Sequence, residues 1–486
     1  MKHGWAFMDS LTEAIEAWSG AVARRNPQIF LHLGMDLRHA IERDLFFKLV
    51  NDTTLQERFD AHMDGQMSRP APPDPWRAAI EPYLALAKPT NAEIPRLGPF
   101  RRWRHRAGNL MRLGKPAFTT ADLKSAPEIL FLCIHPKFAD FFLPVANVAG
   151  TGAAFLTVND LPLENYLDGR GLARVGLRLI HSSLPDGPLL RHYSYYCGIL
   201  ESLSAMMEAL KPRLIVVPEG NAPIYELARL AGRKKGVATV CVQHGAPAYT
   251  NPGFRNWHFD DVLVWGDAFI EPFARHNPAQ HFTVTGTPAR LPRAVETGEE
   301  PIRSIGFFLQ KGATVIPAAE WETLLEFIFW TAREFPNLKI IVRDHPSQPH
   351  LSSLERGHLD GLTNVAFMPP PLFSLNDALT ASDVVVASAS TTLLEAVQSG
   401  AIPFIFGTAY PKDFPDIVAA EAAVSAPDLS AAKSLLAQLG EDGAWRMALH
   451  DAGKRLRPHL FAATGDEGAT QIAALLNAPR LSRPFS

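Results

Sequence analysis

Four hydroxyl side chains crowd one short turn in the last quarter of the chain. Ser388, Ser390, Thr391 and Thr392 follow the apolar run Val384–Val386, which is typical of a buried parallel strand. A helix is expected to begin in this turn, because apolar residues then recur at helical spacing. Hydroxyl groups at a helix start cap free backbone N–H groups, and the same N–H groups bind phosphate. The turn therefore predicts either a phosphate-binding corner or an ordinary capped helix of an α/β fold.

Other polar side chains stand at the ends of further predicted strands. The apolar runs Glu128–Ile134 and Leu214–Val217 are typical of strands that are covered on both faces. In open parallel sheets, ligands bind beyond the carboxyl ends of the strands. Residues at such ends are His135, Glu219 and His244 in one half of the chain and His345, Ser388 and Ser390 in the other. If the halves face each other, these side chains line one cleft.

The elements that must position these side chains form three regions. Residues 1–120 read as a helical N-terminal region with a Pro-rich linker and a basic segment. Short apolar runs alternate with helical patterns in residues 127–290 and again in 303–478, and this alternation predicts two parallel sheets. The stretch between them, 290–301, has few apolar residues and reads as a linker. We therefore expect an α/β chain with two tandem Rossmann-like domains that face a cleft.

Length and composition restrict the function further. The 486 residues are too many for one core, and 47% hydrophobic with 20% charged residues is typical of a globular protein. A net charge of -3 gives no reason to expect nucleic acid as a partner. Cys133, Cys197 and Cys241 lie in or beside apolar runs, which predicts buried free thiols and a reducing compartment. With neither a signal-peptide pattern nor a long apolar window, a cytoplasmic protein without a membrane span is expected.

A basic run, Arg101–Lys115, precedes the first predicted sheet. Six basic residues alternate there with a tryptophan, a leucine and a methionine. One interpretation is contact with an anionic membrane surface or a phosphate-bearing acceptor, which places the protein at the inner membrane face. The other is a solvated helix face.

Four short motifs together resemble those of a known enzyme class. Tandem Rossmann-like halves resemble the GT-B glycosyltransferases, and more narrowly the bacterial capsule- and wall-polymer transferases that use CMP- or CDP-activated donors. These include the sialyl- and Kdo-type transferases and the CDP-glycerol glycerophosphotransferases. His345-Pro346 and Ser388–Thr391 match their donor half, whereas His244-Gly245 and Glu219-Gly220 match the other half. The architecture matches over about residues 127–460, judged by strand order, and the first 120 residues resemble no family.

The resemblance implies roles for the residues of the donor half. His345 binds the donor phosphate and stabilises it as negative charge develops. Ser388, Ser390 and Thr391 bind phosphate through hydroxyls and helix N–H groups. Glu395, one turn inside the expected helix, binds the ribose.

The resemblance also implies an acceptor side. A base must take the proton of the attacking hydroxyl, and Glu219 and His244 are the candidates, with Glu219 preferred for a sugar hydroxyl. His135 and Lys137 are further acceptor-side candidates, and Arg343 adds a charge clamp on the donor. Each histidine also has a plainer interpretation as a hydrogen-bonded turn residue, and Glu219 as the partner of a helix cap.

The expected reaction is transfer of a sugar from a nucleotide-activated donor to a hydroxyl of a glycan, lipid-linked or protein acceptor. No Asp-x-Asp pair occurs, so we expect neither a catalytic metal ion nor a cofactor besides the nucleotide sugar. A donor with one phosphate needs less charge neutralisation, which favours a CMP-sugar over a UDP-sugar.

Three alternatives stay open at this point. One is a UDP-sugar transferase, and another is an enzyme like UDP-N-acetylglucosamine 2-epimerase, which binds a diphosphate in the same way without a separate acceptor. The third is a binding protein with two α/β domains and no catalysis. A Rossmann oxidoreductase is excluded, because no G-x-G-x-x-G follows any predicted strand.

Overall fold

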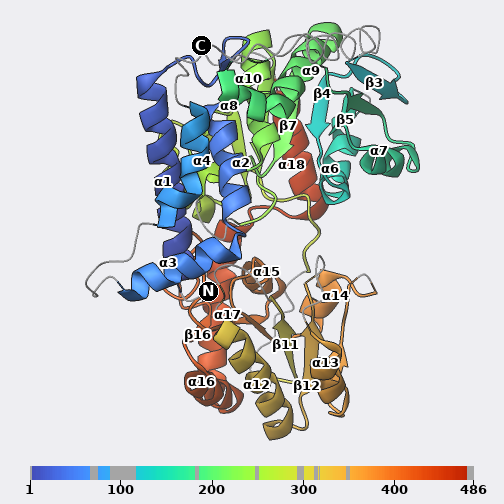
Figure 1. The fold of residues 1–486 in the computed structure, drawn as a ribbon. Coiled ribbons are helices and arrows are strands. Elements are labelled where there is room, and N and C mark those ends of the chain that lie inside the picture. The colour runs from blue at the N-terminus through green and yellow to red at the C-terminus, as the bar shows by residue number, and fades with distance from the viewer. Residues whose placement is uncertain are drawn as a thin grey trace.

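The fold comprises two α/β domains and a helical N-terminal region (Figure 1). The structure is a computed structural model. It describes residues 3–65, 75–87, 117–150, 152–180, 185, 187–246, 251–292, 300–310, 316, 318–345, 351–370 and 372–478. The basic run Arg101–Lys115 lies outside these residues.

The first domain is built on an eight-stranded sheet with the order β10-β9-β8-β7-β4-β5-β6-β3. Neighbouring strands are parallel, except that β3 pairs antiparallel with β6. The strands are β3 (Phe118–Ala121), β4 (Ile129–Leu132), β5 (Ala153–Val158), β6 (Arg174–Leu177), β7 (Leu214–Pro218), β8 (Ala238–Val242), β9 (Asp261–Val264) and β10 (Phe282–Val284).

Helices cover both faces of this sheet, because the central strands bury side chains on either side. In β4, Ile129 and Phe131 join one hydrophobic cluster, whereas Leu130 and Leu132 join another. The helices are α6 (Pro136–Ala149), α7 (Leu161–Asp168), α8 (Gly187–His192), α9 (Ser194–Leu210), α10 (Pro223–Lys235) and α11 (Ile270–Ala274), with 3-10 turns η1 (Pro252–Phe254) and η2 (Asp267–Phe269).

The second domain is built on a six-stranded parallel sheet with the order β13-β12-β11-β14-β15-β16. Its strands are β11 (Ser304–Phe308), β12 (Lys339–Arg343), β13 (Val365–Phe367), β14 (Val384–Ala387), β15 (Ile402–Phe406) and β16 (Val424–Ala426). Its helices are α12 (Ala318–Glu334), α13 (Ser353–Asp360), α14 (Leu375–Thr380), α15 (Thr392–Ser399), α16 (Leu429–Glu441) and α17 (Gly443–Leu460).

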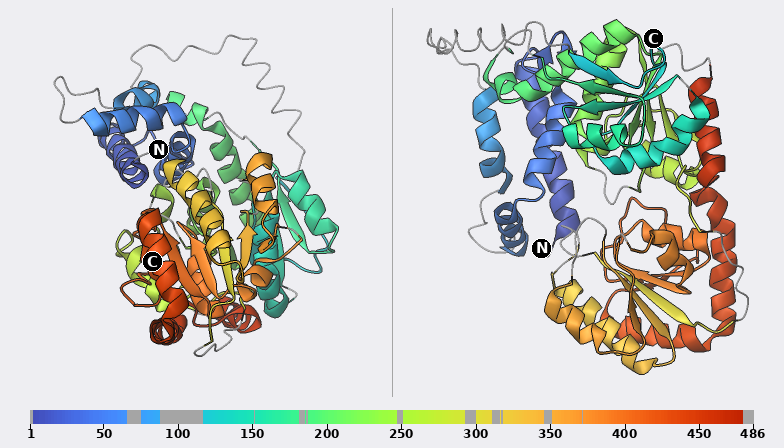
Figure 2. Two further views of the ribbon diagram at one scale, coloured as in Figure 1. Left: turned by 90° about the horizontal axis from the view of Figure 1, so that it is seen from below. Right: turned by 90° about the vertical axis from the view of Figure 1, so that its right-hand side faces the viewer.

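The N-terminal region stands beside the first domain and reaches toward the second (Figures 1 and 2). It contains α1 (Gly4–Arg25), a short hairpin of β1 (Leu31–His32) and β2 (Met35–Asp36), α2 (Arg38–Leu49), α3 (Thr53–Gly65) and α4 (Pro75–Ala87). Within the described ranges, no helix combines the length and the apolar character that a membrane crossing requires.

The last helix, α18 (Gly465–Asn477), returns to the first domain (Figure 2). Its residues Ile472 and Leu476 are buried in the same cluster as Phe142 of α6. The range 303–478 was predicted from sequence as the second domain, but the packing partner of its final helix is the first sheet. The chain thus crosses between the domains twice.

Backbone segments approach each other closely where the chain crosses back. A Cβ atom built on Gly266 would lie 2.0 Å from the carbonyl oxygen of His459, and one on Gly286 would lie 2.2 Å from that of Ala463. Trp265 stacks on Phe461 with ring centroids 5.4 Å apart. Glycines are required at this junction because no side chain fits between the two backbones.

Most predicted elements are present, and the exceptions are short. No sequence pattern indicates β3, β16 or the β1–β2 hairpin, which have two to four residues each. Helix α14 begins at Leu375, after the cap Ser374. Pro82 lies inside α4.

Replacing Gly286 by alanine is expected to destabilise the protein. The residue has φ +78°, and its Cβ would collide with the Ala463 carbonyl, so the free energy of unfolding should fall by more than about 1 kcal/mol. Gly357→Ala is the control, because this helical glycine has open space around it and alanine should add about 0.5–1 kcal/mol. Urea unfolding measures both, and equal effects of the two variants would contradict the close approach.

Candidate active site

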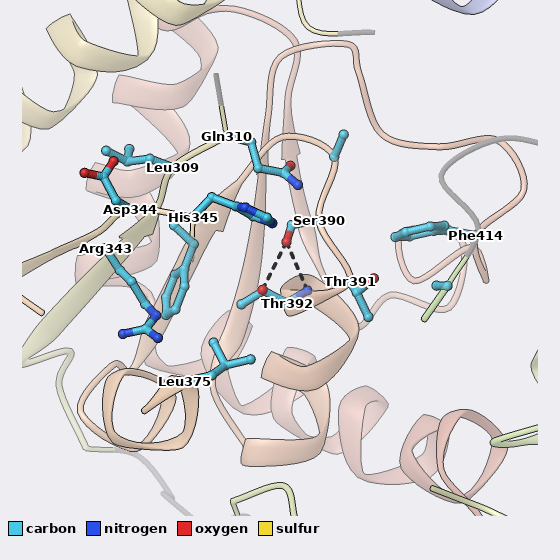
Figure 3. A pocket seen from close by; sticks show the side chains of 13 residues that line it. Leu309, Gln310, Arg343, Asp344, His345, Leu375, Ser390, Thr391, Thr392 and Phe414 are labelled. Carbon is cyan, nitrogen blue, oxygen red and sulfur yellow. Dashed lines mark hydrogen bonds between the residues drawn. The ribbon is translucent and has the colours of Figure 1, made fainter. Parts of the chain in front are cut away.

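The hydroxyl-rich turn lies at the carboxyl end of β14, as the sequence predicts. The Ser390 hydroxyl accepts a hydrogen bond from the backbone N–H of Thr392 at 3.2 Å and donates one to the Thr392 hydroxyl at 3.0 Å (Figure 3). It therefore caps the first turn of α15. Gly400, with φ +87°, ends this helix.

A cavity of about 370 Å³ opens over this turn. Its volume lies in the range of small-ligand sites. Most of its lining comes from the ends of β11, β12 and β14, and Ala246 contributes from the first domain. The polar lining residues are Gln310, Arg343, Asp344, His345, Ser390, Thr391 and Thr392.

His345 extends into this cavity and points toward Ser390 (Figure 3). Burial lowers the pKa of its imidazole, and the positive charge of Lys137 lowers it further. A neutral imidazole at this place can donate one hydrogen bond to a phosphate oxygen.

Arg343 lines the cavity, but its guanidinium is turned away from Ser390 (Figure 3). Its Nη1 donates to the carbonyl oxygens of Met368 and Phe373, at 2.8 and 2.9 Å. Burial lowers its pKa, while the charge of Asp377 opposes this shift. In this arrangement Arg343 holds the loop after β13.

Two of the predicted donor residues do not line the cavity. Ser388 is buried behind the turn, with 4% of its surface exposed. Glu395 is half-buried, and burial raises its pKa to about 7, although a hydrogen bond from Thr392 opposes the shift. Their assignment to phosphate and ribose stays a prediction.

On the first domain, Glu219 and His244 form a pair. Glu219 Oε1 lies 3.0 Å from His244 Nδ1, and Glu219 Oε2 accepts a hydrogen bond from Asn221 Nδ2 at 3.1 Å. Burial alone would raise the pKa of Glu219, but His244, Lys137 and Asn221 outweigh it, so this pKa is lowered. The carboxylate is therefore ionised.

The turn that presents Glu219 is strained. Glu219 has φ +58° and Gly220 has φ +72°, which places a side-chain-bearing residue in the left-handed region. Backbone N–H groups hold it, from Glu219 to Val242 at 3.0 Å and from Gly220 to Pro218 at 2.6 Å. Strain of this kind clusters at functional sites.

Aromatic rings fix the imidazole of His244. Its ring packs edge-on against Phe138 and Phe141, with centroids 4.9 and 4.8 Å apart. The preceding Gln243 is anchored by Trp265, whose backbone N–H and indole Nε1 donate to it at 2.9 and 2.8 Å. Nδ1 of this ring faces Glu219, so Nε2 is the ring nitrogen that does not contact the carboxylate.

The two acceptor-side candidates begin helix α6. His135 Nδ1 accepts a hydrogen bond from the Lys137 backbone N–H at 3.1 Å, so His135 is the helix cap and matches its plainer interpretation. The Lys137 ammonium lies 4.6 Å from the centre of the Phe138 ring. Its charge lowers the pKa of Glu219 and of His345, which belong to different domains. Lys137 therefore lies near enough to both side chains for its charge to affect them.

Sequence reasoning missed several residues of this site. Gln310 follows β11 and lines the cavity, and the strand-end rule that found His345 would also have found it. Ala246, Phe138 and Phe141 gave no such signal, because their contribution depends on packing. In the part of the chain that the structure describes, no three His, Cys, Asp or Glu residues gather as a metal site would require.

No protein-family model and no curated protein matches the sequence. Solved structures do. The glycotransferase of kitacinnamycin is 16% identical, with 73% of this chain and 99% of the other covered and a TM-score of 0.50. The UDP-GlcNAc 2-epimerase from Neisseria meningitidis bound to UDP-GlcNAc is 12% identical, with 72% and 100% covered and a TM-score of 0.49. A putative UDP-N-acetylglucosamine 2-epimerase from Listeria monocytogenes is 13% identical, with 72% and 95% covered and a TM-score of 0.49.

At these identities the likeness concerns the fold. The likeness to the kitacinnamycin glycotransferase, with a TM-score of 0.50, confirms the predicted α/β fold with two Rossmann-like parallel-sheet domains, which in this chain follow a helical N-terminal region. The donor nucleotide and the reaction must therefore be inferred from the residues of the site.

Because of the pair of Glu219 and His244, the free energy of unfolding should decrease as the pH falls in the acid range. A carboxyl whose pKa is lowered by folding contributes stability above its unfolded pKa, near 4.5, and loses it as pH falls through the folded value. Glu219→Gln removes this contribution. The difference in melting temperature between wild type and variant should therefore be fully present above about pH 5 and shrink as the pH falls below about 4.5. A difference that stays constant down to pH 3 would contradict the lowered pKa.

Proposed function

We propose that the chain is a glycosyltransferase that binds a nucleotide sugar in the cavity of the second domain. The observation that supports this most directly is the ionised Glu219, paired with His244, close in sequence to Ala246, which lines the cavity of His345 and Ser390. The pair offers a proton acceptor, and the cavity offers hydrogen-bond donors for a phosphate.

In the proposed reaction, an acceptor hydroxyl gives its proton to the Glu219 and His244 pair. The acceptor oxygen forms a bond to the anomeric carbon of the sugar while the bond between that carbon and the phosphate oxygen breaks. The nucleotide leaves with the bonding electrons. His345 and the hydroxyl of Thr391, which both line the cavity, stabilise the negative charge that gathers on it. The two side chains can share this proton, because Nδ1 of His244 lies 3.0 Å from Oε1 of Glu219.

The proposal specifies neither the nucleotide base nor the acceptor. Nothing in the described cavity selects cytidine, so the CMP-sugar expected from the sequence has no advantage over a UDP-sugar. Glycan, lipid-linked and protein acceptors all present the hydroxyl that the reaction needs. Contact with the inner membrane face through Arg101–Lys115 remains part of the hypothesis only.

A UDP-sugar 2-epimerase is the second candidate. The same carboxylate and imidazole, 3.0 Å apart, can remove a proton and return one, as an epimerase requires. Proton NMR of the protein with UDP-N-acetylglucosamine alone separates the two, because an epimerase forms a new sugar isomer without any acceptor.

Nucleotide binding should depend on the second domain. In a thermal-shift panel of CMP, CDP, UMP, UDP, GDP and NAD, a ligand present at about 100 times its dissociation constant adds about 2.7 kcal/mol. Ser390→Ala and His345→Ala should reduce this stabilisation. The matched controls are Ser430→Ala, an exposed serine in the first turn of α16, and His358→Ala, an exposed histidine of α13. A response to none of these nucleotides, or one that both site variants retain in full, would contradict the proposal.

Turnover should depend on the first domain. Glu219→Gln keeps the shape of the side chain but removes the base, so release of nucleotide from the sugar nucleotide that the panel selects should fall about 10²- to 10⁴-fold. Nucleotide affinity should stay unchanged, because the cavity belongs to the other domain. Glu208→Gln, at an exposed carboxylate, is the control. Full turnover in Glu219→Gln would remove this residue from the mechanism.

A further inference from the structure

We propose that the N-terminal region positions the proposed base, and that Arg43 of α2 is the positioning residue for Glu219. This inference rests on the proposed function, because it assigns Glu219 the role of proton acceptor. It gives a purpose to the first 65 residues, which no motif explains. The proposal follows a series of contacts from the strained turn to the buried guanidinium of Arg43.

The first step is the contact between the strained turn and the loop 251–259. A Cβ atom built on Gly220 would lie 3.0 Å from the Phe259 ring and 3.2 Å from the Trp257 ring. One built on Gly253 would lie 2.6 Å from the carbonyl oxygen of Asn221. The loop 251–259 therefore lies directly against Glu219-Gly220-Asn221 and leaves this turn little room to relax.

The second step is the support of that loop. Inside the first domain, Asn251 caps Gly253 at 2.7 Å, and Trp257 Nε1 donates to the Gly253 carbonyl at 2.7 Å. The N-terminal region adds two contacts. Arg43 Nε donates to the carbonyl oxygen of Pro252 at 3.4 Å, and Glu16 of α1 pairs with Arg255 at 3.2 Å.

The third step is the second contact of Arg43. Its Nη1 lies 3.4 Å from Glu226 Oε2 on α10, the helix that begins just after the Glu219 turn. Figure 1 shows α2 alongside α10. Arg43 thus touches the loop behind the turn and the helix that follows it, and movement of either changes the direction in which Glu219 points.

The charges at this junction favour a fixed geometry. Arg43 is fully buried, and Glu226 is bound by Arg229 through bonds of 2.5 and 3.0 Å. Burial would raise the pKa of Glu226, but the two arginines lower it to about 2. A buried charge keeps its partner because separation leaves both groups desolvated. Arg43 therefore has Glu226 as its charged partner and the Pro252 carbonyl as its hydrogen-bond acceptor.

Arg43→Met in the full-length protein tests the proposal. Methionine fills the space, and Glu226 keeps Arg229 as its partner, but the contact with Pro252 is lost. We expect kcat to fall about 10- to 100-fold, the cost of a misplaced catalytic group. KM for the sugar nucleotide and the dissociation constant of the free nucleotide should stay within about twofold, because their cavity is in the other domain. Amide exchange of residues 217–222 should become faster.

Three further variants keep the test decisive. Arg38→Met is the matched control, because this arginine of α2 is 31% exposed, and it should change nothing. Gly253→Ala pushes on Asn221 from the loop side and should reproduce the effect, so it decides the matter if Arg43→Met fails to fold. Arg43→Lys should restore only part of the kcat that Arg43→Met loses. One ammonium group cannot contact both Pro252 and Glu226.

The outcomes separate this proposal from the proposed function. Unchanged amide exchange at 217–222 together with normal kcat in a folded Arg43→Met or Gly253→Ala overturns the positioning role. An equal loss of nucleotide affinity also overturns it, because this shows general damage. Normal turnover in Glu219→Gln overturns the function instead, while the exchange measurement still reports whether Arg43 holds the turn.

Discussion

Parallel pairing of β7 with β8 is the constraint on which the candidate site depends. Pro218 lies opposite Val242 in the register of these strands, and both strands end at this edge of the sheet. Glu219 and His244, separated by 25 residues in sequence, therefore meet at 3.0 Å. The register also explains the strain, because the Glu219 N–H completes the ladder with the Val242 carbonyl while its side chain must turn back over the strand end.

Local strain of this kind persists only where the surroundings hold it. Here the surroundings come from three places in the chain: the aromatic residues of loop 251–259, the start of α6 and the helices before residue 65. Phe138 and Phe141 orient the imidazole, and Lys137 in the same helix turn supplies a positive charge that keeps Glu219 ionised. One helix start therefore serves both the geometry and the electrostatics of the pair.

Sequence patterns predict the interior of this protein better than its periphery. Runs such as Leu214–Val217 are apolar throughout, because these strands are buried on both faces. The bounds of the central strands were therefore predicted to within a residue or two. The edge strands β3 and β16 are short and partly exposed, and their pairing partners lie far away in sequence. The return of α18 to the first sheet has no local signature either, because an amphipathic helix does not show which face it will cover.

The same difference applies to the site. The strand-end rule found Glu219, His244, His345 and Ser390, because position in the sheet determines where these residues lie. The family resemblance implied that Arg343 is a charge clamp on the donor. In the structure its guanidinium binds the carbonyl oxygens of Met368 and Phe373, a contact that depends on the path of a loop. One hydrophobic cluster contains Val217 and Cys241, beside the Glu219 turn, together with Ala389 and Leu393, beside the hydroxyl-rich turn. The two halves of the proposed site therefore depend on packing that both domains share.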